Sequence, residues 1–372
     1  MAHRACNLAW LTLAAATSLA ACSGPSGNAE QQQAASNSAE PRAPDGRRYL
    51  SQPLVRDIYT ADPSAHVFDG RLYIYPSHDI DGDAVEDDLG GHFEMRDYRV
   101  LSLDKPGGAV TVHPVALDVD DVPWAQKQMW APDAAYKDGT YYLYFPAKDR
   151  DGAFRIGVAT SKSPVGPFKA APQPIKGSFS IDPAVFTDGD GASYMVFGGI
   201  WGGQLQRNTT GTYDPNGSKT DLEAPDQPAL SPKIARMAPG MTEFAEKPRD
   251  VQILDPQGKP ILGGDTDRRF FEAAWLHRFG GKYYLSYSTG DTHYLVYATG
   301  DSPYGPFTYR GRILEPVNGW TSHHSIAQWD GKWWLFYHDV QLSGQTRLRN
   351  VKMTPLTHNA DGTIQTINPF VQ

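Results

Sequence analysis

Carboxyl and imidazole side chains recur in this chain at one kind of place, just before an aromatic stretch. The segments are "ADPSAHVF" with Asp62, "MWAPDAAY" with Asp133, "SIDPAVF" with Asp182, "FFEAAWLHRF" with Glu272, and "TSHHSIAQW" with His323 and His324. A single Asp-Pro usually starts a turn, because Asp bonds its own backbone and the residue before Pro leaves the helical region. Carboxyls gathered at one place would instead support general acid–base catalysis, in which one donates a proton and another activates water.

Five aromatic strands follow these residues, and each begins with an acidic or Gly-Gly turn. They are "FDGRLYIYPSHD" (68–79), "KDGTYYLYFPAKD" (137–149), "TDGDGASYMVFGG" (187–199), "FGGKYYLSYSTGD" (279–291) and "WDGKWWLFYHD" (329–339). Asp-Gly and Gly-Gly supply the positive φ values of tight hairpin turns. Repeated units that each hold several strands are typical of propeller blades, whereas a β-sandwich needs no such self-similarity. The sequence therefore predicts an all-β fold, a five-bladed β-propeller.

A propeller would bring these distant residues together. The innermost strand of each blade runs along the central channel, so residues at equivalent positions of the repeats surround one axis. Asp62, Asp182 and Glu272 stand at the same place in three units, Asp133 stands slightly later in a fourth, and the fifth supplies the two histidines. Recurrence at one register indicates an active site rather than a set of turn residues.

The composition limits the partners. The 372 residues are 40% hydrophobic and 12% aromatic, with 29 Pro and 36 Gly, which favours many turns over long helices. The net charge is −8 and the chain has no long Lys/Arg run, so nucleic acid is not an expected partner. Neutral or metal-bridged ligands fit this charge better.

The N-terminus has the layout of an export signal. Residues 1–21 combine an early Arg4 with an apolar run that is too short to span a membrane, and "LAAC" resembles the lipobox in which Cys22 is lipidated. The alternative is a plain secretory signal cut nearby. Residues 22–49 are polar and predict a flexible tether, which leaves residues 50–372 as a single catalytic domain. We expect a periplasmic or outer-membrane-anchored lipoprotein that contacts the membrane only through the lipid on Cys22.

The five motifs "ADPS", "WAPD", "IDPA", "FFEAAWLHRFGGKYYLSYS" and "HHSI", in this order, resemble glycoside hydrolase family 43. Members of this family are five-bladed propeller enzymes that act on xylans and arabinans. The similarity covers residues 55–370, including the closing "LRNVKMTPLTHNADGTI". Each motif is weak alone, but five in register with the blades are specific.

The resemblance implies roles for the three carboxyls. Asp62 matches the general base, Glu272 the general acid, and Asp182 the carboxylate that tunes the pKa of the acid and orients it. Such a pair inverts the anomeric carbon when a water fits between the two groups. The acid must stay protonated, which requires burial or a neighbouring negative charge. Taken alone, Asp62 and Asp182 would be ordinary turn residues. Glu272 stands between the apolar stretches "FF" and "AAW", and burial of an unpaired carboxyl is costly, which favours a functional role for Glu272.

The resemblance also implies a Ca²⁺ ion on the channel axis, held mainly by water and by one histidine of the last blade. His323 is the match, and His324 is the other option. A polar rim is the simpler interpretation of a His-His pair, and the zinc motif HExxH is absent from this sequence. The ion would have a structural and electrostatic role, because Ca²⁺ acidifies water little.

Contacts to a sugar can also be predicted. Trp130 beside Asp133 is a stacking platform or, alternatively, a core residue. Arg349 matches a substrate-facing arginine of the family, with Arg347 as the other option. The acidic insertion "SHDIDGDAVEDDLGGHFEMRDY" (77–98) is expected to be mostly a solvated loop.

The sequence leaves the glycosidic linkage open. The sequence around Glu272 looks most like that of β-xylosidases, so we expect an exo-acting inverting β-xylosidase that releases β-D-xylose units from xylo-oligosaccharides. An α-L-arabinofuranosidase or arabinanase that takes arabino-oligosaccharides is the alternative on the same scaffold. A sugar-binding propeller without turnover and an assembly scaffold are alternatives of another class, and both predict a broken carboxyl triad.

Overall fold

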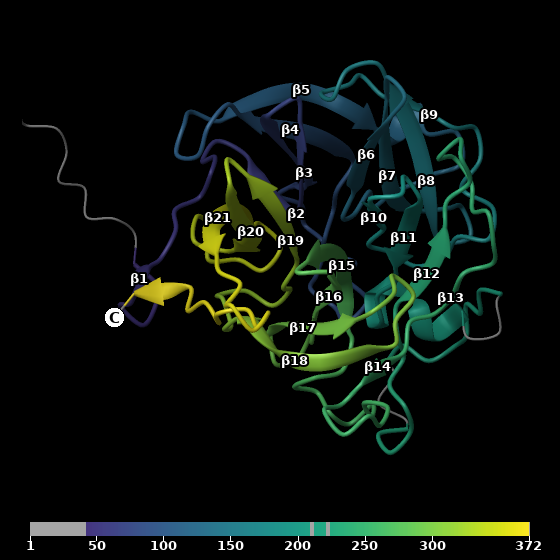
Figure 1. Ribbon diagram of the computed structural model, residues 1–372. Coiled ribbons are helices and arrows are strands. Elements are labelled where there is room, and N and C mark those ends of the chain that lie inside the picture. Colours follow the sequence, from purple (N-terminus) through teal and green to yellow (C-terminus); the bar gives the residue numbers. More distant parts are fainter. Residues whose placement is uncertain (1–41, 209–211, 221–223, 372) are drawn as a thin grey trace, which may run out of the picture. The chain divides into compact units, whose positions relative to one another are not determined.

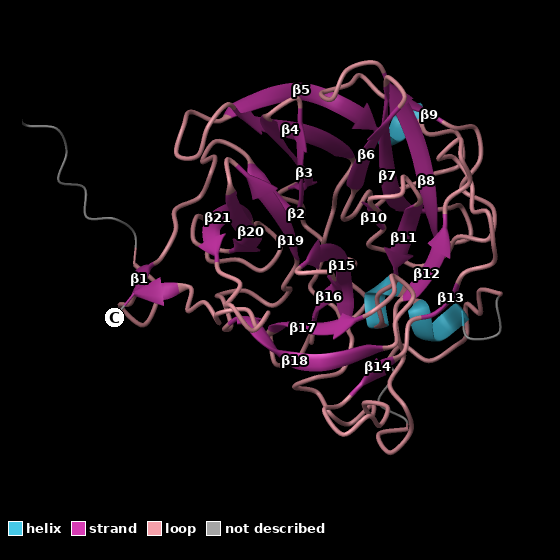
Figure 2. Ribbon diagram, viewed as in Figure 1, coloured by secondary structure: helices cyan, strands magenta, loops and turns pink. Residues whose placement is uncertain are grey.

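Five sheets arranged around a central channel form the fold, as predicted (Figures 1 and 2). The computed structural model describes residues 42–208, 212–220 and 224–371. The strands of the first two blades are β2 (Tyr59–Phe68), β3 (Arg71–Asp79), β4 (Asp97–Leu103) and β5 (Thr111–Asp118), then β6 (Asp133–Lys137), β7 (Thr140–Lys148), β8 (Phe154–Ser161) and β9 (Lys169–Ala170).

The other three blades continue this order. Their strands are β10 (Ala184–Thr187), β11 (Ser193–Phe197), β12 (Lys233–Arg236) and β13 (Arg249–Asp250), then β15 (Glu272–Phe279), β16 (Lys282–Ser288), β17 (Leu295–Gly300) and β18 (Phe307–Leu314), and finally β19 (His324–Trp329), β20 (Lys332–Asp339) and β21 (Asn350–Leu356). The fourth blade gains a parallel edge strand, β14 (Ile253–Leu254). Short 3₁₀ turns occupy Val119–Asp121, Trp201–Gly203 and Leu205–Asn208.

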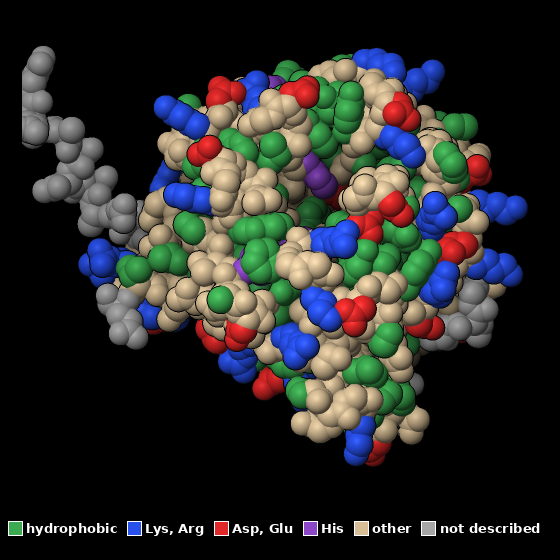
Figure 3. Space-filling view, viewed as in Figure 1, with side chains coloured by type: hydrophobic (Ala, Val, Ile, Leu, Met, Phe, Trp, Pro, Cys, Tyr) green, Lys and Arg blue, Asp and Glu red, His purple; other side chains and the backbone are tan. Residues whose placement is uncertain are grey.

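The first strand of every blade lies at the centre. Strands β2, β6, β10, β15 and β19 each contact the next one in this series, and β19 contacts β2, so they form a closed ring (Figure 1). Figure 3 shows that the face in view is hollowed where the blades meet, with a histidine at the opening. Residues at equivalent positions of these strands therefore do surround one channel.

The hairpin turns form because their residues accept positive φ. Asp69 and Gly70 have φ values of 51° and 79° between β2 and β3. Asp138 and Gly139 repeat this geometry with 50° and 74°. Both central residues of a type I′ turn need positive φ, which explains the Asp-Gly pairs.

The folded unit begins earlier than predicted. Strand β1 (Arg48–Tyr49) pairs with β22 (Phe370–Val371), and the buried side chain of Ala43 joins Tyr49 and Phe370 in a small apolar cluster. The predicted tether 22–49 is therefore wrong at its C-terminal end. Cys22 and the predicted signal 1–21 lie outside the described residues. Among the residues described, no helix is long and apolar enough to cross a membrane.

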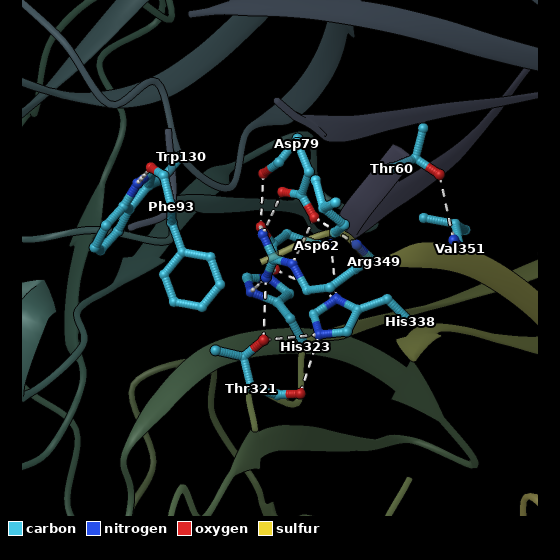
Figure 4. A network of polar contacts seen from close by, with 12 residues as sticks. Thr60, Asp62, Asp79, Phe93, Trp130, Thr321, His323, His338, Arg349 and Val351 are labelled. Atoms are coloured by element: carbon cyan, nitrogen blue, oxygen red, sulfur yellow. Dashed lines mark hydrogen bonds and ion pairs between the residues drawn. The ribbon is translucent and has the colours of Figure 1, made fainter. Parts of the chain in front are cut away.

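The last blade is joined to the first by hydrogen bonds of the backbone and of one threonine side chain. The N–H of Thr60 donates to the carbonyl of Arg349 at 2.9 Å, and the N–H of Val351 donates to Oγ1 of Thr60 at 3.2 Å (Figure 4). These bonds tie the start of β21 to β2, so residues from the two ends of the chain meet at the channel.

Candidate active site

The strand pairing shows which residues share a layer of the channel. One residue on the innermost strand of each blade pairs with the equivalent residue of the second strand of that blade. These five residues are Ser64, Asp133, Ala184, Trp275 and Ser325. Asp62, Asp182 and His323 come two residues before a member of that layer, and Glu272 comes three before. Asp62, Asp182, Glu272 and His323 thus belong to one layer of the channel, and Asp133 belongs to the next layer.

An unusual backbone conformation presents the carboxyls. Asp62 and Asp182 have φ values of 48° and 56°, and Ala273, directly after Glu272, has 62°. The register of β2 shifts between Ala61 and Ser64, and that of β15 shifts next to Glu272. Such bulges re-aim side chains and often accompany functional sites. They explain how Glu272 shares a layer with the aspartates although it stands one residue earlier.

The three carboxyls line one cavity of about 190 Å³. Its wall also includes His323, Arg349, Trp130 and aromatic residues from the loops. The volume is smaller than the roughly 300–1,000 Å³ of pockets for drug-sized ligands, and it suits one small polar ring with part of a second.

Asp62 is held as a carboxylate. Its oxygens accept hydrogen bonds from Nη1 and Nη2 of Arg349 at 2.9 and 3.2 Å and from the hydroxyl of Ser77 at 2.6 Å, and its backbone N–H donates to Nδ1 of His338 at 2.9 Å (Figure 4). Burial has the largest single effect and would raise the pKa of Asp62, but the charge of Arg349, the two neighbouring histidines and the hydrogen bond from Ser77 together outweigh it and lower the pKa to about 2. Asp62 is therefore ionised near neutral pH.

Arg349 is fixed by a second carboxylate. Asp79 accepts from Nε and Nη2 of Arg349 at 2.9 and 2.8 Å and also from its backbone N–H at 2.8 Å. The guanidinium lies over the ring of Phe93, 4.8 Å from its centroid (Figure 4). This bidentate pairing gives the guanidinium one orientation, in which it can serve Asp62 and the cavity together.

Glu272 has the opposite electrostatic setting. Burial, and then the negative charge of Asp62, raise the pKa of Glu272 to about 8. Asp182 accepts the N–H of Ala273 at 2.9 Å, and burial together with the charge of Glu272 raises the pKa of Asp182 as well. The pair therefore retains a proton near neutral pH. A protonated carboxyl and an ionised one in the same cavity are the requirements for acid–base hydrolysis.

His323 lies between two of the carboxyls. Its Nδ1 is 3.8 Å from Oδ1 of Asp62 and 3.8 Å from Oδ2 of Asp182. Burial lowers the pKa of His323 to about 4, so the imidazole is neutral at pH 7. His324 is fully buried with its Nε2 2.6 Å from the hydroxyl of Ser286, and it is not part of the cavity wall.

The donor set does not fit a calcium ion held by the protein. Ca²⁺ takes six to eight oxygen ligands. The described part of the chain has no group of three or more His, Cys, Asp or Glu side chains that could hold a metal. His323 offers a single nitrogen, and the neighbouring oxygens of Asp62 are already bonded to Arg349 and Ser77.

Asp133 is displaced from the predicted site. Its carboxylate is fully buried, lies outside the cavity wall, and accepts hydrogen bonds from the hydroxyl of Ser64, the ring of His66 and the N–H of Val185. It therefore links the inner strands of the first three blades. The later position of Asp133 in its unit is the reason, because two residues along a strand move a side chain by one layer.

Trp130 combines features of both predicted roles. It lines the cavity, as a stacking platform would, but it is only 8% exposed and its Nε1 donates to the carbonyl of Phe93 at 3.0 Å, as in a core residue. Arg347 lies outside the wall and pairs with Asp81 at 2.9 Å. The acidic insertion contributes more than predicted, since Glu86, Asp87 and Asp88 form part of the rim.

Sequence reasoning missed several residues that complete the site. Asp79 and His338 stand at the ends of strands that were identified, so the end of the second strand in a blade was an available signal. Trp201 and Trp320 also line the cavity, but they lie in loops without a repeat pattern. No spacing in the sequence connects them.

A five-bladed propeller with an acid and a base in a central cavity defines a class of sugar-cleaving hydrolases. The chain matches the family model "Glycosyl hydrolases family 43" over residues 59–364. It belongs to glycoside hydrolase family 43, as its motifs indicated.

Similar proteins are known. A xylosidase/arabinosidase of Humicola insolens is 58% identical over 327 residues, which cover 85% of this chain and 99% of that protein. A β-xylosidase of Xylanibacter ruminicola is 51% identical and covers 83% and 97%. A solved structure of a β-xylosidase/α-arabinofuranosidase from a compost microbial metagenome, in a calcium-free complex with xylotriose, is 66% identical, with a TM-score of 0.86 and coverage of 88% and 100%.

Proposed function

We propose that this protein is an exo-acting β-xylosidase that removes β-linked D-xylosyl units from xylo-oligosaccharides with inversion and releases them as α-xylose. The observation that carries the proposal is the divided protonation of one cavity, with Asp62 ionised beside Arg349 and Glu272 protonated. The names and the xylotriose complex of the most similar relatives support the substrate class.

The reaction follows from these two groups. A water molecule attacks the anomeric carbon while Asp62 accepts its proton. Glu272 gives its proton to the glycosidic oxygen, and the bond between that oxygen and the anomeric carbon breaks. Asp182 holds the backbone after Glu272 through the N–H of Ala273, and its repulsion with Glu272 favours the state in which this pair keeps one proton. Arg349 keeps Asp62 ionised and orients it.

Action at a chain end is supported by the size of the cavity. About 190 Å³ admits one sugar ring with part of a second, and the lining includes Glu86, Trp201 and Trp320. A second activity on α-L-arabinofuranosides is favoured by the double names of the relatives. Both sugar units present a similar scissile bond to such a cavity.

Two further expectations remain proposals. Calcium binding near His323 would have to occur mainly through water, and no step of the reaction depends on it. Export and lipid attachment at Cys22 rest on the N-terminal sequence alone. Labelling with radioactive palmitate, compared between the full chain and Cys22→Ser, tests the attachment, and equal labelling of both would refute it.

The function is tested with purified protein on p-nitrophenyl β-D-xyloside, p-nitrophenyl α-L-arabinofuranoside and xylotriose. The proposal predicts xylose and xylobiose as the first products from xylotriose and faster turnover of the xyloside. Asp62→Asn is the matched control for a contaminating activity. Absence of xylose release, or preferred cleavage of internal bonds in longer oligosaccharides, would overturn the proposal.

A further inference from the structure

We propose that three basic residues beside the cavity, Lys127, Lys148 and Arg207, form a site for the carboxylate of an acidic sugar on the leaving part of the substrate. This inference rests on the proposed function and deepens it, because it adds a uronic acid unit to the xylo-oligosaccharides that the protein accepts. The three residues, called the cation cluster below, lie outside the cavity wall. They select the substrate and take no part in the reaction.

Two members of the cation cluster are paired through their backbones. Lys127 and Lys148 form an antiparallel bridge in which the N–H of Lys148 donates to the carbonyl of Lys127 at 3.0 Å. Side chains that are directly opposite in such a pair lie close together, and like charges there are destabilising. Burial, and then the charge of Lys127, lower the pKa of Lys148 to about 8. An anion bound by both ammonium groups would relieve this repulsion.

Arg207 adds a third positive charge from a neighbouring loop. It lies in the 3₁₀ turn Leu205–Asn208. Gln204, directly before this turn, accepts the N–H of Phe154 through its Oε1 at 2.8 Å, which ties the turn to the second blade. The charge of Arg207 acts on Lys148 and contributes to its lowered pKa. Three positive charges thus converge on one place.

No carboxylate neutralises the cation cluster within the described part of the chain. The ion pairs there use other lysines and arginines, such as Arg155 with Asp149. The charge of Asp87 also acts on Lys148, but Oδ1 of Asp87 accepts the N–H groups of Leu89 and Gly91 at 3.0 and 2.8 Å. A chain with a net charge of −8 therefore keeps three basic side chains together without an acidic partner, which indicates a negatively charged ligand.

Aromatic rings hold the cation cluster next to the cavity. Nζ of Lys148 lies 4.9 Å from the centre of the Phe154 ring and 5.8 Å from that of the Trp130 ring. Both distances are those of cation–π contacts. The two rings are 4.7 Å apart, and Trp130 is also part of the cavity wall. A branch on an oligosaccharide that is bound in the cavity therefore has only a short way to Lys148.

The cation cluster lies toward the general acid. A Cβ at Gly199 would be 3.3 Å from the Cβ of Glu272, and from Gly199 the chain runs along the cavity wall to the turn with Arg207. The general acid protonates the leaving oxygen, so the leaving part of the substrate lies on this side. Ammonium groups bind anions as point charges, which suits a carboxylate on a flexible branch.

The test compares two substrates that differ only in one charge. The first is xylotriose with a glucuronic acid on its reducing-end unit, and the second is the same compound with the carboxyl reduced to a primary alcohol. At low salt, kcat/KM should be roughly threefold to tenfold higher for the acidic compound, which corresponds to one or two partly exposed ion pairs. This preference should shrink at high salt, because the charges are screened. In Lys148→Met it should fall to about one, and Lys127→Met and Arg207→Met should each lower it.

Lys169→Met is the control, because Lys169 is an exposed lysine on β9 of the same blade and lies outside the cavity wall. Its preference for the acidic compound should equal that of the wild type, and thermal unfolding confirms that each variant is folded. An equal or slower reaction of the wild type with the acidic compound, or a preference that salt and folded Lys148→Met leave unchanged, would overturn the cation cluster as a carboxylate site. A wild type that also fails to hydrolyse unsubstituted xylotriose would overturn the proposed function instead.

Discussion

A single guanidinium group binds both oxygens of Asp62, with Nη1 of Arg349 2.9 Å from Oδ1 and Nη2 3.2 Å from Oδ2. The two residues are 287 positions apart: Asp62 lies in β2 of the first blade, and Arg349 directly precedes β21 of the last blade. The closure of the propeller thus creates the ionised state of the base. The ion pair between Arg349 and Asp62 therefore both links the last blade to the first and keeps the base in the cavity ionised.

Removal of the base should abolish hydrolysis while the fold persists. Asp62→Asn cannot accept a proton from water, and we expect turnover to fall by about 10²–10⁴-fold or more. Asn tolerates the positive φ of 48°, so circular dichroism and thermal unfolding should remain close to wild type. Near wild-type turnover of this variant would refute the assignment of Asp62.

The acid limb of the pH–rate profile should depend on Arg349. The guanidinium makes the largest contribution among the groups that lower the pKa of Asp62 to about 2, so its removal must raise that pKa. In Arg349→Met, the acid limb of kcat/KM should therefore move to higher pH, because the base becomes protonated earlier. Stability should also fall by about 3–5 kcal/mol, since Asp62 and Asp79 lose a buried partner. Arg349→Lys, which keeps the charge, is the comparison, and an unmoved limb in folded Arg349→Met would contradict the account.

The alkaline limb should depend on Asp182. The proton on Glu272 is lost as the pH rises through about 8, because burial and the charge of Asp62 retain it until then. Glu272 and Asp182 also repel each other when both are ionised, so removal of the Asp182 charge should ease the loss of that proton. Asp182→Asn should move the alkaline limb to lower pH and reduce turnover heavily. Substrates with good leaving groups should suffer less, because they need little protonation. Full activity with an unshifted limb would leave Asp182 as an ordinary turn residue.

Asp133 should matter for stability rather than for chemistry. Asp133→Asn replaces a carboxylate that is hydrogen-bonded to the N–H of Val185, the hydroxyl of Ser64 and the ring of His66 by an amide, which has only one acceptor oxygen. We expect a loss of about 1–3 kcal/mol in the free energy of unfolding, with kcat far less affected than in Asp62→Asn. Denaturant unfolding and steady-state kinetics on both variants decide this point. A large loss of kcat at unchanged stability would contradict this prediction and would show that Asp133 acts in the active site.

The repeated part of the chain was the part that could be predicted. Asp-Gly turns and alternating aromatic residues determine the hairpins locally, so the blades followed from the sequence, and so did the placement of Asp62 on the inner strand β2 and of Asp182 directly before the inner strand β10. Glu272 stands one residue out of register, and the bulge at Ala273 compensates for this shift. Asp133 was misplaced because one layer of the channel corresponds to two residues of a strand.

The other half of the site could not be predicted, because it depends on tertiary contacts alone. Asp79 is one acid among several near the insertion, and only the arrival of Arg349 from the last blade shows its role. Trp201 and Trp320 lie in loops whose course no repeat determines. The pKa values of the carboxyls likewise depend on burial that no short motif reveals.

The anomeric form of the first product tests the central claim most directly. An ionised Asp62 that activates water opposite a protonated Glu272 must invert the anomeric carbon. Proton NMR of a β-xyloside reaction, recorded before mutarotation, should show α-xylose as the sugar formed first. Initial formation of β-xylose would mean that the configuration is retained and would contradict the assignment of Asp62 as a base.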